Sequence, residues 1–156
     1  MPWTQVKEFL DKQSIPYVTI THSPAYTAQG IAATAHVRGK ELAKTVIIKV
    51  NGKLAMAVLP APYKINFDRL KEALGDPDAA LAAEHEFEHL FPDCELGAMP
   101  PFGNLYEMDV YVAHSLSEDE EIAFNAGSHS ELIRMAYRDF ERLVHPKVRH
   151  FTTHAG

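Results

Sequence analysis

The sequence predicts an α+β (α/β) fold in which helices pack against a mixed β-sheet. A strong β-hairpin pattern lies in the first half of the chain, capped helical stretches surround it, and further short strands follow. Because hairpins and helices are interleaved in this order, we expect both antiparallel and parallel strand neighbours in one sheet. No internal repeat or interdomain linker interrupts the pattern.

The N-terminal part predicts two helices and one strand. Apolar residues recur at helical spacing over residues 4–13, which favours an amphipathic helix. Residues 17–21 alternate and include β-branched side chains, which is typical of a strand. Thr27 is a suitable cap for a second helix that runs to about His36.

The hairpin is the clearest local prediction. Residues 44–50 and 53–59 are both strand-like, and Asn51-Gly52 separates them. This pair is preferred in two-residue turns because both positions require a positive φ angle. We therefore expect a tight antiparallel pair in the middle of the sheet.

The second half combines short elements of both kinds. Asn66 can cap a helix that ends at Gly75. The elements expected after it are a mostly helical stretch at 79–91, an irregular loop at 97–104, strands at 110–113 and 122–125 separated by an acidic turn at 117–121, a strand at 132–136 and a helix at 138–144. We predict one domain over residues 1–145, followed by a flexible tail at 146–156.

Composition indicates a cytoplasmic protein. The 156 residues fit one domain and can bury a core without metals or disulfides. Cys94 is the sole cysteine, which excludes an intrachain disulfide framework and suits a reducing compartment. The N-terminus lacks an apolar signal core, and no apolar run reaches the roughly 20 residues of a membrane helix.

Charge is unevenly distributed along the chain. The net charge of −6 argues against a protein that coats nucleic acid non-specifically. Residues 38–53 nevertheless carry five cations and one acid, whereas residues 67–131 carry sixteen acids and two cations. Charge alone favours two solvated faces. The alternative is a local anion site that accepts a few phosphates.

Lys44 is the first candidate for chemistry. It precedes an apolar strand and shares a face with Val46, Ile48 and Val50 at a period of two. The pattern alone favours a strand-end lysine whose stem lies along the core and whose amine reaches water. The functional alternative is an amine in a pocket, where a lower dielectric strengthens its interaction with a phosphate or carbonyl oxygen.

The second candidate is the loop from Gly97 to Gly103, Gly-Ala-Met-Pro-Pro-Phe-Gly. Its prolines stiffen the backbone, and its glycines allow amides to approach a ligand closely. Such a loop either presents backbone groups to an oxyanion or a water, or serves as a rigid connector.

The third candidate is the polar turn at 125–130. His129 in this turn is either a hydrogen-bonding or basic group, or a simple turn residue.

The motif His85-Glu86-Phe87-Glu88-His89 matches the zinc-protease pattern H-E-x-x-H. Neighbouring acids and Pro92, which ends the helix, favour an acidic surface helix with two exposed histidines instead. Cys94 lies between two acids, which disfavours a reactive thiolate.

Four stretches together resemble the YbaK and prolyl-tRNA synthetase-associated editing domain family. They are residues 22–27, 41–49, 97–103 and 124–129, and the resemblance spans roughly residues 15–145. It implies a mixed, partly barrel-like sheet flanked by helices. It also implies hydrolysis of the ester between an amino acid and the terminal adenosine of tRNA, without a metal or other cofactor. The two histidines at 85 and 89 depart from the family's plain acidic helix.

The resemblance also implies the site. Lys44 would hold the phosphate or aminoacyl region, the loop backbone would orient water and carbonyl, and the substrate's own ribose hydroxyl would assist. The implied catalytic residues are Lys44, Gly97, Pro101, Gly103 and His129. The implied substrate-binding residues are His22, Tyr26, Thr45, Met99, Phe102, Asn125, Gly127 and Ser128.

The sequence leaves three candidate functions. The leading prediction is a trans-acting aminoacyl-tRNA deacylase whose partners are the tRNA acceptor end and, as a second candidate, an aminoacyl-tRNA synthetase, with no membrane partner. The first alternative is a non-catalytic module of the same fold that binds tRNA ends or a synthetase. The second is a zinc-dependent hydrolase that uses His85 and His89.

Overall fold

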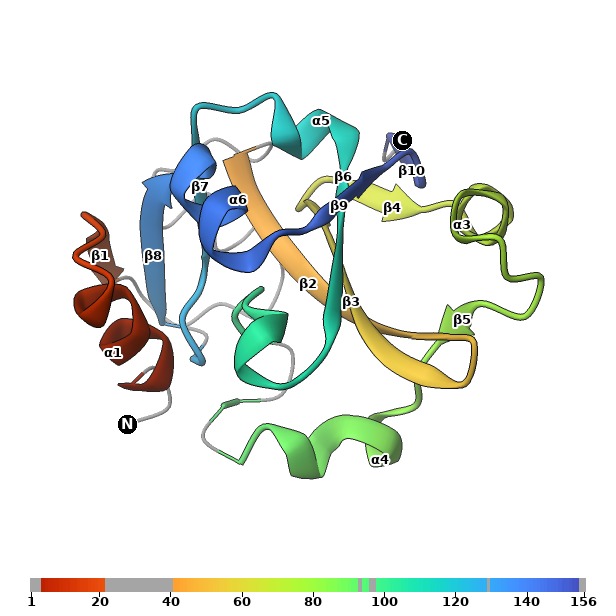
Figure 1. The fold of residues 1–156 in the computed structure, drawn as a ribbon, viewed down its shortest axis with the longest axis horizontal. Helices are drawn as coiled ribbons and strands as arrows, with labels where there is room; N and C mark the ends of the chain where they lie inside the picture. Colours follow the sequence, from red (N-terminus) through yellow and green to blue (C-terminus); the bar gives the residue numbers. More distant parts are fainter. Residues whose placement is uncertain (1–3, 22–40, 93, 96–97, 129, 155–156) are drawn as a thin grey trace.

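The computed structural model describes residues 4–21, 41–92, 94–95, 98–128 and 130–154. Helices and strands alternate along the chain, as Figure 1 shows. The helices are α1 (Thr4–Lys12), α3 (Phe67–Leu74), α4 (Glu84–Phe87), α5 (His114–Ser117) and α6 (Tyr137–Val144), with short 3-10 turns η2 (Glu88–Leu90) and η3 (Gly103–Leu105). The strands are β1 (Val18–Thr21), β2 (Leu42–Val50), β3 (Lys53–Pro60), β4 (Tyr63–Ile65), β5 (Ala80–Leu81), β6 (Asp109–Ala113), β7 (Glu121–Asn125), β8 (Glu131–Ala136), β9 (Lys147–Arg149) and β10 (Thr152–His154).

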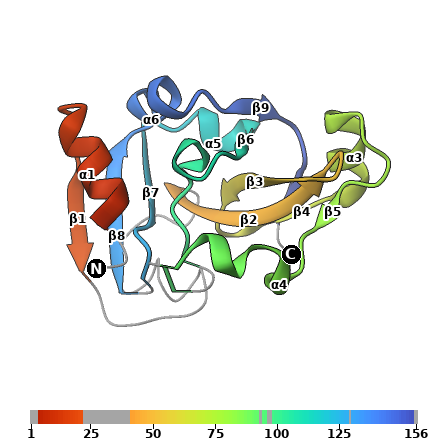
Figure 2. The same cartoon turned by 60° about the horizontal axis from the view of Figure 1, so that its bottom comes forward.

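An eight-stranded mixed sheet forms the centre of the molecule, which confirms the predicted fold class. Its order is β1-β8-β7-β2-β3-β6-β9, with β5 paired to β2 outside this path. The β2–β7, β3–β6 and β6–β9 pairs are parallel, and the other pairs in this sheet are antiparallel. β10 and β4 form a separate two-stranded sheet. Figure 2 shows α1 beside β1 and β8, and α3 at the opposite end.

The predicted hairpin is confirmed as β2 and β3, and its turn has the expected geometry. Asn51 and Gly52 have φ angles of 51° and 79°, as a two-residue hairpin turn requires. The buried carboxylate of Asp76 fixes this turn, because it accepts a hydrogen bond from the Asn51 N–H at 2.7 Å. Hydrogen bonds from the backbone of Asn51 and then of Asp78 lower the pKa of Asp76.

Alternation along the hairpin supplies two hydrophobic cores. Ala43 and Ile47 belong to a core that includes residues of α1 and α6, whereas Ile48 and Val50 belong to a second core with α3. Because successive side chains of a strand point to opposite faces, the central sheet separates the two cores. This assignment decides on which side each site residue lies.

Most of the predicted elements are confirmed within a residue or two. The helix after Asn66 begins with its side chain accepting from the Arg69 N–H at 3.1 Å, and it ends at Gly75, whose φ is 65°. The helix expected after Thr27 lies outside the described residues.

The helical stretch expected at 79–91 is wrong in part. Residues 80–81 form β5 against β2, and only α4 and η2 are helical. The physical reason is tertiary pairing: the free edge of β2 accepts this segment, and the Ala82 N–H donates to the Ile47 carbonyl at 3.1 Å. Such pairing overrides a modest helical propensity.

The predicted loose tail is also wrong for residues 147–154. β9 joins the central sheet beside β6, and β10 pairs with β4, a strand that the sequence pattern did not predict. Phe151 lies between them with none of its surface exposed, in the second core. Burial of this phenyl ring and the two short strand pairings stabilise the segment.

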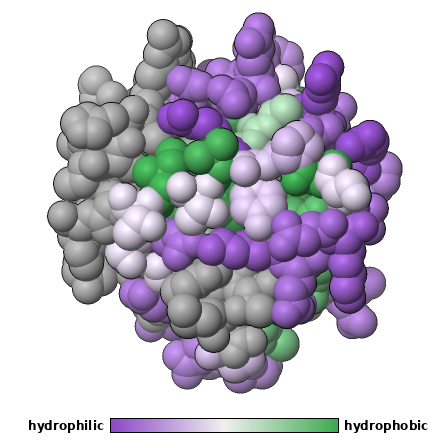
Figure 3. All heavy atoms as spheres, turned by 90° about the vertical axis from the view of Figure 1, so that its left-hand side faces the viewer, coloured by the Kyte–Doolittle hydropathy of each residue, from purple (hydrophilic) through white to green (hydrophobic). Residues whose placement is uncertain are grey.

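None of the described helices is long and apolar enough to cross a membrane. Figure 3 shows the side that carries α1 and β1, where hydrophobic residues are exposed in a limited area among hydrophilic ones. Val18 of the edge strand β1 is one exposed hydrophobic residue, with 58% of its surface accessible.

Candidate functional site

Lys44 lies near the start of β2, on the face of the sheet that continues into the second core. It is opposite Leu59 of β3 and two residues from Val46, which packs against that core. Its side chain is half-buried. The strand therefore holds the aliphatic stem against apolar neighbours and leaves the amine at the boundary between core and solvent.

The environment lowers the pKa of Lys44. Burial is the larger cause, because it disfavours the charged amine, and the positive charge of Lys64 adds to it. Lys64 approaches because the chain reverses after β3: the Ala61 N–H donates to the Leu42 carbonyl at 2.7 Å, and β4 follows directly. A second cation thus stands near the predicted catalytic amine.

Asn125, at the end of β7, is the neighbour of Lys44 across the parallel strand pair. The ladder joins Ala43 to Phe124, so Lys44 and Asn125 follow as the next residues on the two strands. Because Ala43 and Phe124 both enter the first core, Lys44 and Asn125 point to the other face. The Asn125 Oδ1 atom is buried and accepts no hydrogen bond from the described residues. An unpaired buried amide oxygen is costly, so a ligand is a natural partner for it.

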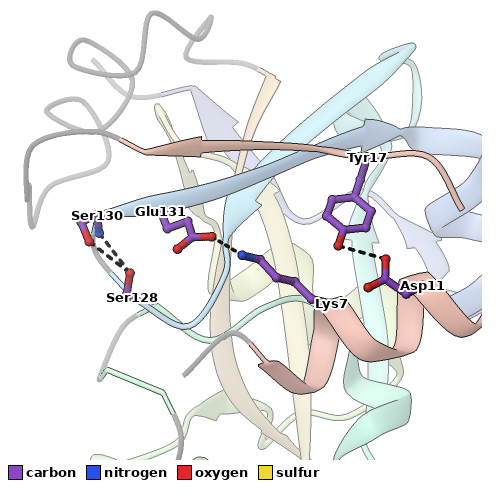
Figure 4. Close-up of polar contacts among 6 residues, drawn as sticks. All are labelled: Lys7, Asp11, Tyr17, Ser128, Ser130 and Glu131. Atoms are coloured by element: carbon purple, nitrogen blue, oxygen red, sulfur yellow. Dashed lines mark hydrogen bonds and ion pairs between the residues drawn. The ribbon is translucent and has the colours of Figure 1, made fainter. Parts of the chain in front are cut away.

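The turn that follows Asn125 is rigid and polar. Gly127 has a φ of 97°, and the Ala126 N–H donates to the Glu131 carbonyl at 3.1 Å. The buried Ser128 hydroxyl accepts from the Ser130 N–H at 3.3 Å, as Figure 4 shows. Glu131, just beyond the turn, forms an ion pair with Lys7 of α1. The turn is therefore fixed from within and anchored at its base.

Backbone hydrogen bonds attach the Gly-Pro loop to this turn. The Gly127 N–H donates to the Ala98 carbonyl at 2.9 Å, and the Glu95 N–H donates to the Gly127 carbonyl at 2.7 Å. Through β2, β7 and this turn, Lys44, Asn125, Gly127 and Ala98 form a continuous series of neighbours at one end of the sheet. The convergence of Lys44 with Gly97 itself stays a prediction, because Gly97 lies outside the described residues.

The side chains of the loop are buried. Ala98, Met99 and Phe102 have 0%, 5% and 0% of their surface accessible, and Pro101 is buried too. The Phe102 ring packs in the first core, with ring centroids 5.4 Å from Phe124 and 5.5 Å from Phe140. The loop can therefore offer a ligand its backbone, whereas its side chains hold it in place.

Gly103 is required for packing. A Cβ atom there would lie 2.5 Å from the Met108 carbonyl oxygen and 2.6 Å from a methyl group of Val110. The Gly103 carbonyl accepts hydrogen bonds from the N–H groups of Tyr106 and Met108, both at 2.9 Å. The glycine at this end of the loop thus allows close approach to the start of β6, which is a different reason from the ligand access that the sequence suggested.

Thr45 points away from Lys44. It lies between Lys44 and Val46 on β2, so its side chain is on the opposite face of the sheet. Four further residues predicted for the site lie outside the described residues. These are Gly97, His129, His22 and Tyr26.

The H-E-x-x-H segment does not form one helix. α4 ends at Phe87, and His89 falls in the 3-10 turn that follows, so the two histidines lose the regular spacing of that motif. Glu86 forms an ion pair with Lys49 and accepts from the Ala83 N–H at 2.8 Å, and its pKa is lowered chiefly by the hydrogen bond from Lys49. Across the described part of the chain, no three His, Cys, Asp or Glu side chains are grouped so as to hold a metal ion.

Lys64 is a residue near the site that the sequence pattern missed. Its place near Lys44 depends on β4, a strand that the sequence analysis did not predict. The alternation of Tyr63, Lys64 and Ile65 is the one sequence signal that could have indicated a short strand with an outward cation.

Comparison with known proteins identifies a family. The sequence model of the aminoacyl-tRNA editing domain matches residues 22–143. The chain is 27% identical over 150 residues to the multifunctional Ser/Thr-tRNA deacylase ProXp-y of Escherichia coli K12, which covers 91% of this chain and 87% of the relative. It is 22% identical over 87 residues to a proline–tRNA ligase of Bacillus mycoides, covering 56% of this chain and 15% of the ligase.

Solved structures share the fold. The hypothetical protein APE2540 superimposes with a TM-score of 0.83 at 23% identity, covering 95% of this chain and 99% of the other. A protein proposed as a trans-editing enzyme for prolyl tRNA synthetase superimposes with a TM-score of 0.81 at 16% identity, covering 97% of each chain. At these identities the likeness concerns the arrangement of helices and strands.

Proposed function

This chain belongs to the aminoacyl-tRNA editing domain family and is an aminoacyl-tRNA hydrolase, and on that basis we propose how its residues carry the reaction. In the reaction a water oxygen adds to the carbonyl carbon of the aminoacyl ester. The bond from that carbon to the ribose oxygen then breaks, and a proton passes to the ribose oxygen. The products are a free amino acid and uncharged tRNA.

The observation that carries the proposal is the pairing of Lys44 with Asn125. By the strand register, a half-buried amine near the start of β2 neighbours a buried amide oxygen at the end of β7 that no described residue hydrogen-bonds. We assign the Lys44 ammonium to the carbonyl or phosphate oxygen of the aminoacyl-adenosine end. Reduced solvation strengthens this interaction as negative charge develops on the carbonyl.

Asn125 receives a complementary role. Its Oδ1 atom is an acceptor, and the α-ammonium group or a ribose hydroxyl of the substrate is a donor of matching chemistry. Filling this acceptor would orient the ester relative to Lys44. Orientation alone contributes substantially to an ester hydrolysis, because the aminoacyl ester is already activated.

The Gly-Pro loop contributes backbone groups rather than side chains. The Ala98 carbonyl accepts a hydrogen bond from the Gly127 N–H, and the side chains of residues 98–101 are buried, which supports a fixed main-chain surface beside the ester. We propose that this surface, with Gly97 and Pro101, positions the attacking water. Met99, Phe102 and Gly103 support its shape, and Ser128 and Gly127 hold it from the other side. The assignments of His22, Tyr26, Thr45 and His129 to the substrate remain predictions.

The partner that follows is the acceptor end of a tRNA. Relatives include proline–tRNA ligases, so a synthetase that supplies mischarged tRNA is a second candidate partner. Because one relative is named for Ser- and Thr-tRNA, these two esters are the first substrates to test. An apolar pocket discriminates between two amino acids that differ by one methylene or hydroxyl by only about 1–3 kcal/mol. We therefore expect the protein to accept several amino acids.

The test is a deacylation screen with purified protein and a panel of misacylated tRNAs that includes Ser, Thr, Ala and Cys esters. We expect hydrolysis well above the buffer rate for at least one ester, unchanged by a chelator. tRNA binding without hydrolysis of any ester would overturn the catalytic assignment and favour a binding module. For any substitution of Lys44, the matched control is Lys53→Ala, at an exposed position of the hairpin, which reports the nonspecific effects of losing a lysine.

A further inference from the structure

A basic surface extends from the site across β4, α3 and the two C-terminal strands. Residues 145–153 carry Lys147 and Arg149, two histidines and no acid, in a chain whose net charge is −6. In Figure 1, β4, β10 and α3 lie at the same end of the molecule, and α5 stands close to β10. α3 carries Asp68 and Glu72 beside Arg69 and Lys71, so the local attraction for an anionic partner comes from Arg69 together with Lys147 and Arg149 of the C-terminal segment.

Two adjoining hollows give this surface its shape. One has a volume of about 310 Å³ and includes Tyr63, Arg69, His114 and His150 in its lining. The other has a volume of about 380 Å³, and the charged and histidine residues in its lining are Arg69, Arg149, His150 and one acid, Glu72. The two hollows adjoin because Arg69 and His150 line both, and we call them together the Arg69–Arg149 surface, or track.

The cations of this surface are already oriented. One guanidinium nitrogen of Arg69 donates to the Thr152 carbonyl at 3.1 Å, and one of Arg149 donates to the Val148 carbonyl at 2.7 Å. A guanidinium has five N–H donors, so each retains several for a ligand. The rings of His114 and His150 are stacked, with centroids 4.6 Å apart and an angle of 24° between the planes. These contacts reduce the side-chain entropy that binding would otherwise remove.

An unsatisfied polar atom lies in the same track. Ser115 lines the hollow beside His114, and its buried Oγ atom has no hydrogen-bond partner among the residues that the structure describes. A hydroxyl in this position can donate to an oxygen of a bound ligand. Two guanidinium groups, a hydroxyl and two imidazoles within adjoining hollows match the chemistry of phosphodiester groups.

The track is connected to the proposed catalytic end. Lys64 of β4 pairs with Thr153 of β10, and the Ala61–Leu42 hydrogen bond brings the start of β4 next to the start of β2. A polyanion that passes Arg149 and Arg69 would therefore reach Lys64 and then Lys44. This order corresponds to an RNA strand whose last nucleotide carries the ester.

We propose that the Arg69–Arg149 surface binds backbone phosphates of the tRNA acceptor strand next to the aminoacyl end. The inference rests on the proposed function for the identity of the partner, and it adds a binding track outside the family's sequence motifs. The surface supplies affinity for tRNA and takes no part in the chemistry of the ester. Its contribution is electrostatic, so it weakens with salt.

The test compares the double variant Arg69→Gln/Arg149→Gln with wild-type protein. Binding of uncharged tRNA is measured over a range of salt concentrations, and hydrolysis of an aminoacyl-adenosine ester, which has no phosphate, is measured in parallel. We expect the Kd for tRNA to rise about tenfold and the slope of log K against log salt to fall by about two. The rate on aminoacyl-adenosine is expected to stay the same.

Two controls make the result decisive. Arg138→Gln/Arg142→Gln removes the same charge from α6, outside the track, and is expected to change tRNA affinity by less than about twofold. Arg149→Gln alone, expected to reduce the salt slope by about one, serves if the double variant is unstable because of the Arg69–Thr152 contact. Equal effects of the α6 variant and the track variants, or none from the track variants, would overturn the proposal. If wild-type protein hydrolyses neither misacylated tRNA nor aminoacyl-adenosine, the proposed function is refuted instead, because tRNA binding is measured separately.

Discussion

The start of β2 and the loop at 98–103 both neighbour the end of β7 and the turn after it, but they contribute in opposite ways. At β2, Lys44 keeps a titratable amine at the boundary of the core, next in register to Asn125, whose amide oxygen no described residue hydrogen-bonds. In the loop every described side chain is buried. The first region therefore offers side-chain chemistry, and the second offers a backbone whose position depends on packing. Substitutions in the first should change the rate, whereas substitutions in the second should change stability.

The largest effect is expected from removing the ring that holds the loop. Phe102→Ala should lower the free energy of unfolding by about 3–5 kcal/mol, because the fully buried ring packs against Phe9, Phe124 and Phe140. Urea denaturation measures this change. Phe102→Leu should lose less stability and retain its deacylation rate when folded. A change in KM at unchanged stability in the Leu variant would show that Phe102 contacts the substrate. This result would contradict the assignment of the loop side chains to stability alone.

A smaller effect, on the rate, is expected at Asn125. Asn125→Ala should reduce kcat/KM about tenfold, equivalent to about 1.4 kcal/mol, since it removes one substrate hydrogen bond. The free energy of unfolding should be unchanged or higher, because no described residue hydrogen-bonds the buried Oδ1 atom in the folded protein. The matched control is Asn104→Ala, at an exposed position beside the loop. A destabilised Asn125→Ala variant with a normal rate would assign the amide to the fold.

A shift in pH dependence should sharpen the account of Lys44. Burial and then Lys64 lower the pKa of Lys44, so the rate should fall as pH rises through a value below that of an ordinary lysine. Lys64→Gln removes the second cause, raises the pKa of Lys44 and should move this falling limb to higher pH. The pH profile of kcat/KM, corrected for spontaneous ester hydrolysis, measures the shift. Lys71→Gln on α3 is the control, and an identical shift there would indicate a general charge effect.

The smallest effect is expected at the two histidines of the H-E-x-x-H segment. His85→Ala/His89→Ala should leave kcat/KM within about twofold of wild type, because surface substitutions of this kind change energies by about 0.5 kcal/mol or less. Both residues are exposed, and Glu86 between them is engaged by Lys49. Deacylation by the double variant checks this, and stoichiometric zinc lost together with activity would contradict it.

Local sequence signals predicted the hairpin, the Asn66-capped helix and most strands, because turn and cap chemistry lies within a few residues. The C-terminal strands were missed because their pairing with β6 and β4 depends on distant segments, and Lys-Val-Arg has little strand character by itself. The same limit applied to the site. The family motifs indicated Lys44, the loop and Asn125, but the parallel β2–β7 register and the approach of Lys64 required the tertiary fold.

Replacing Lys44 with Met tests the central claim most directly, because methionine preserves much of the stem and removes the charge. We expect kcat/KM on the best misacylated tRNA to fall about 10²–10³-fold. The urea midpoint should stay the same or rise at neutral pH, since a pKa lowered on folding means that the charged amine destabilises the folded state until pH approaches the unfolded value. A Lys44→Met variant that folds normally and hydrolyses the ester at the wild-type rate would contradict the account.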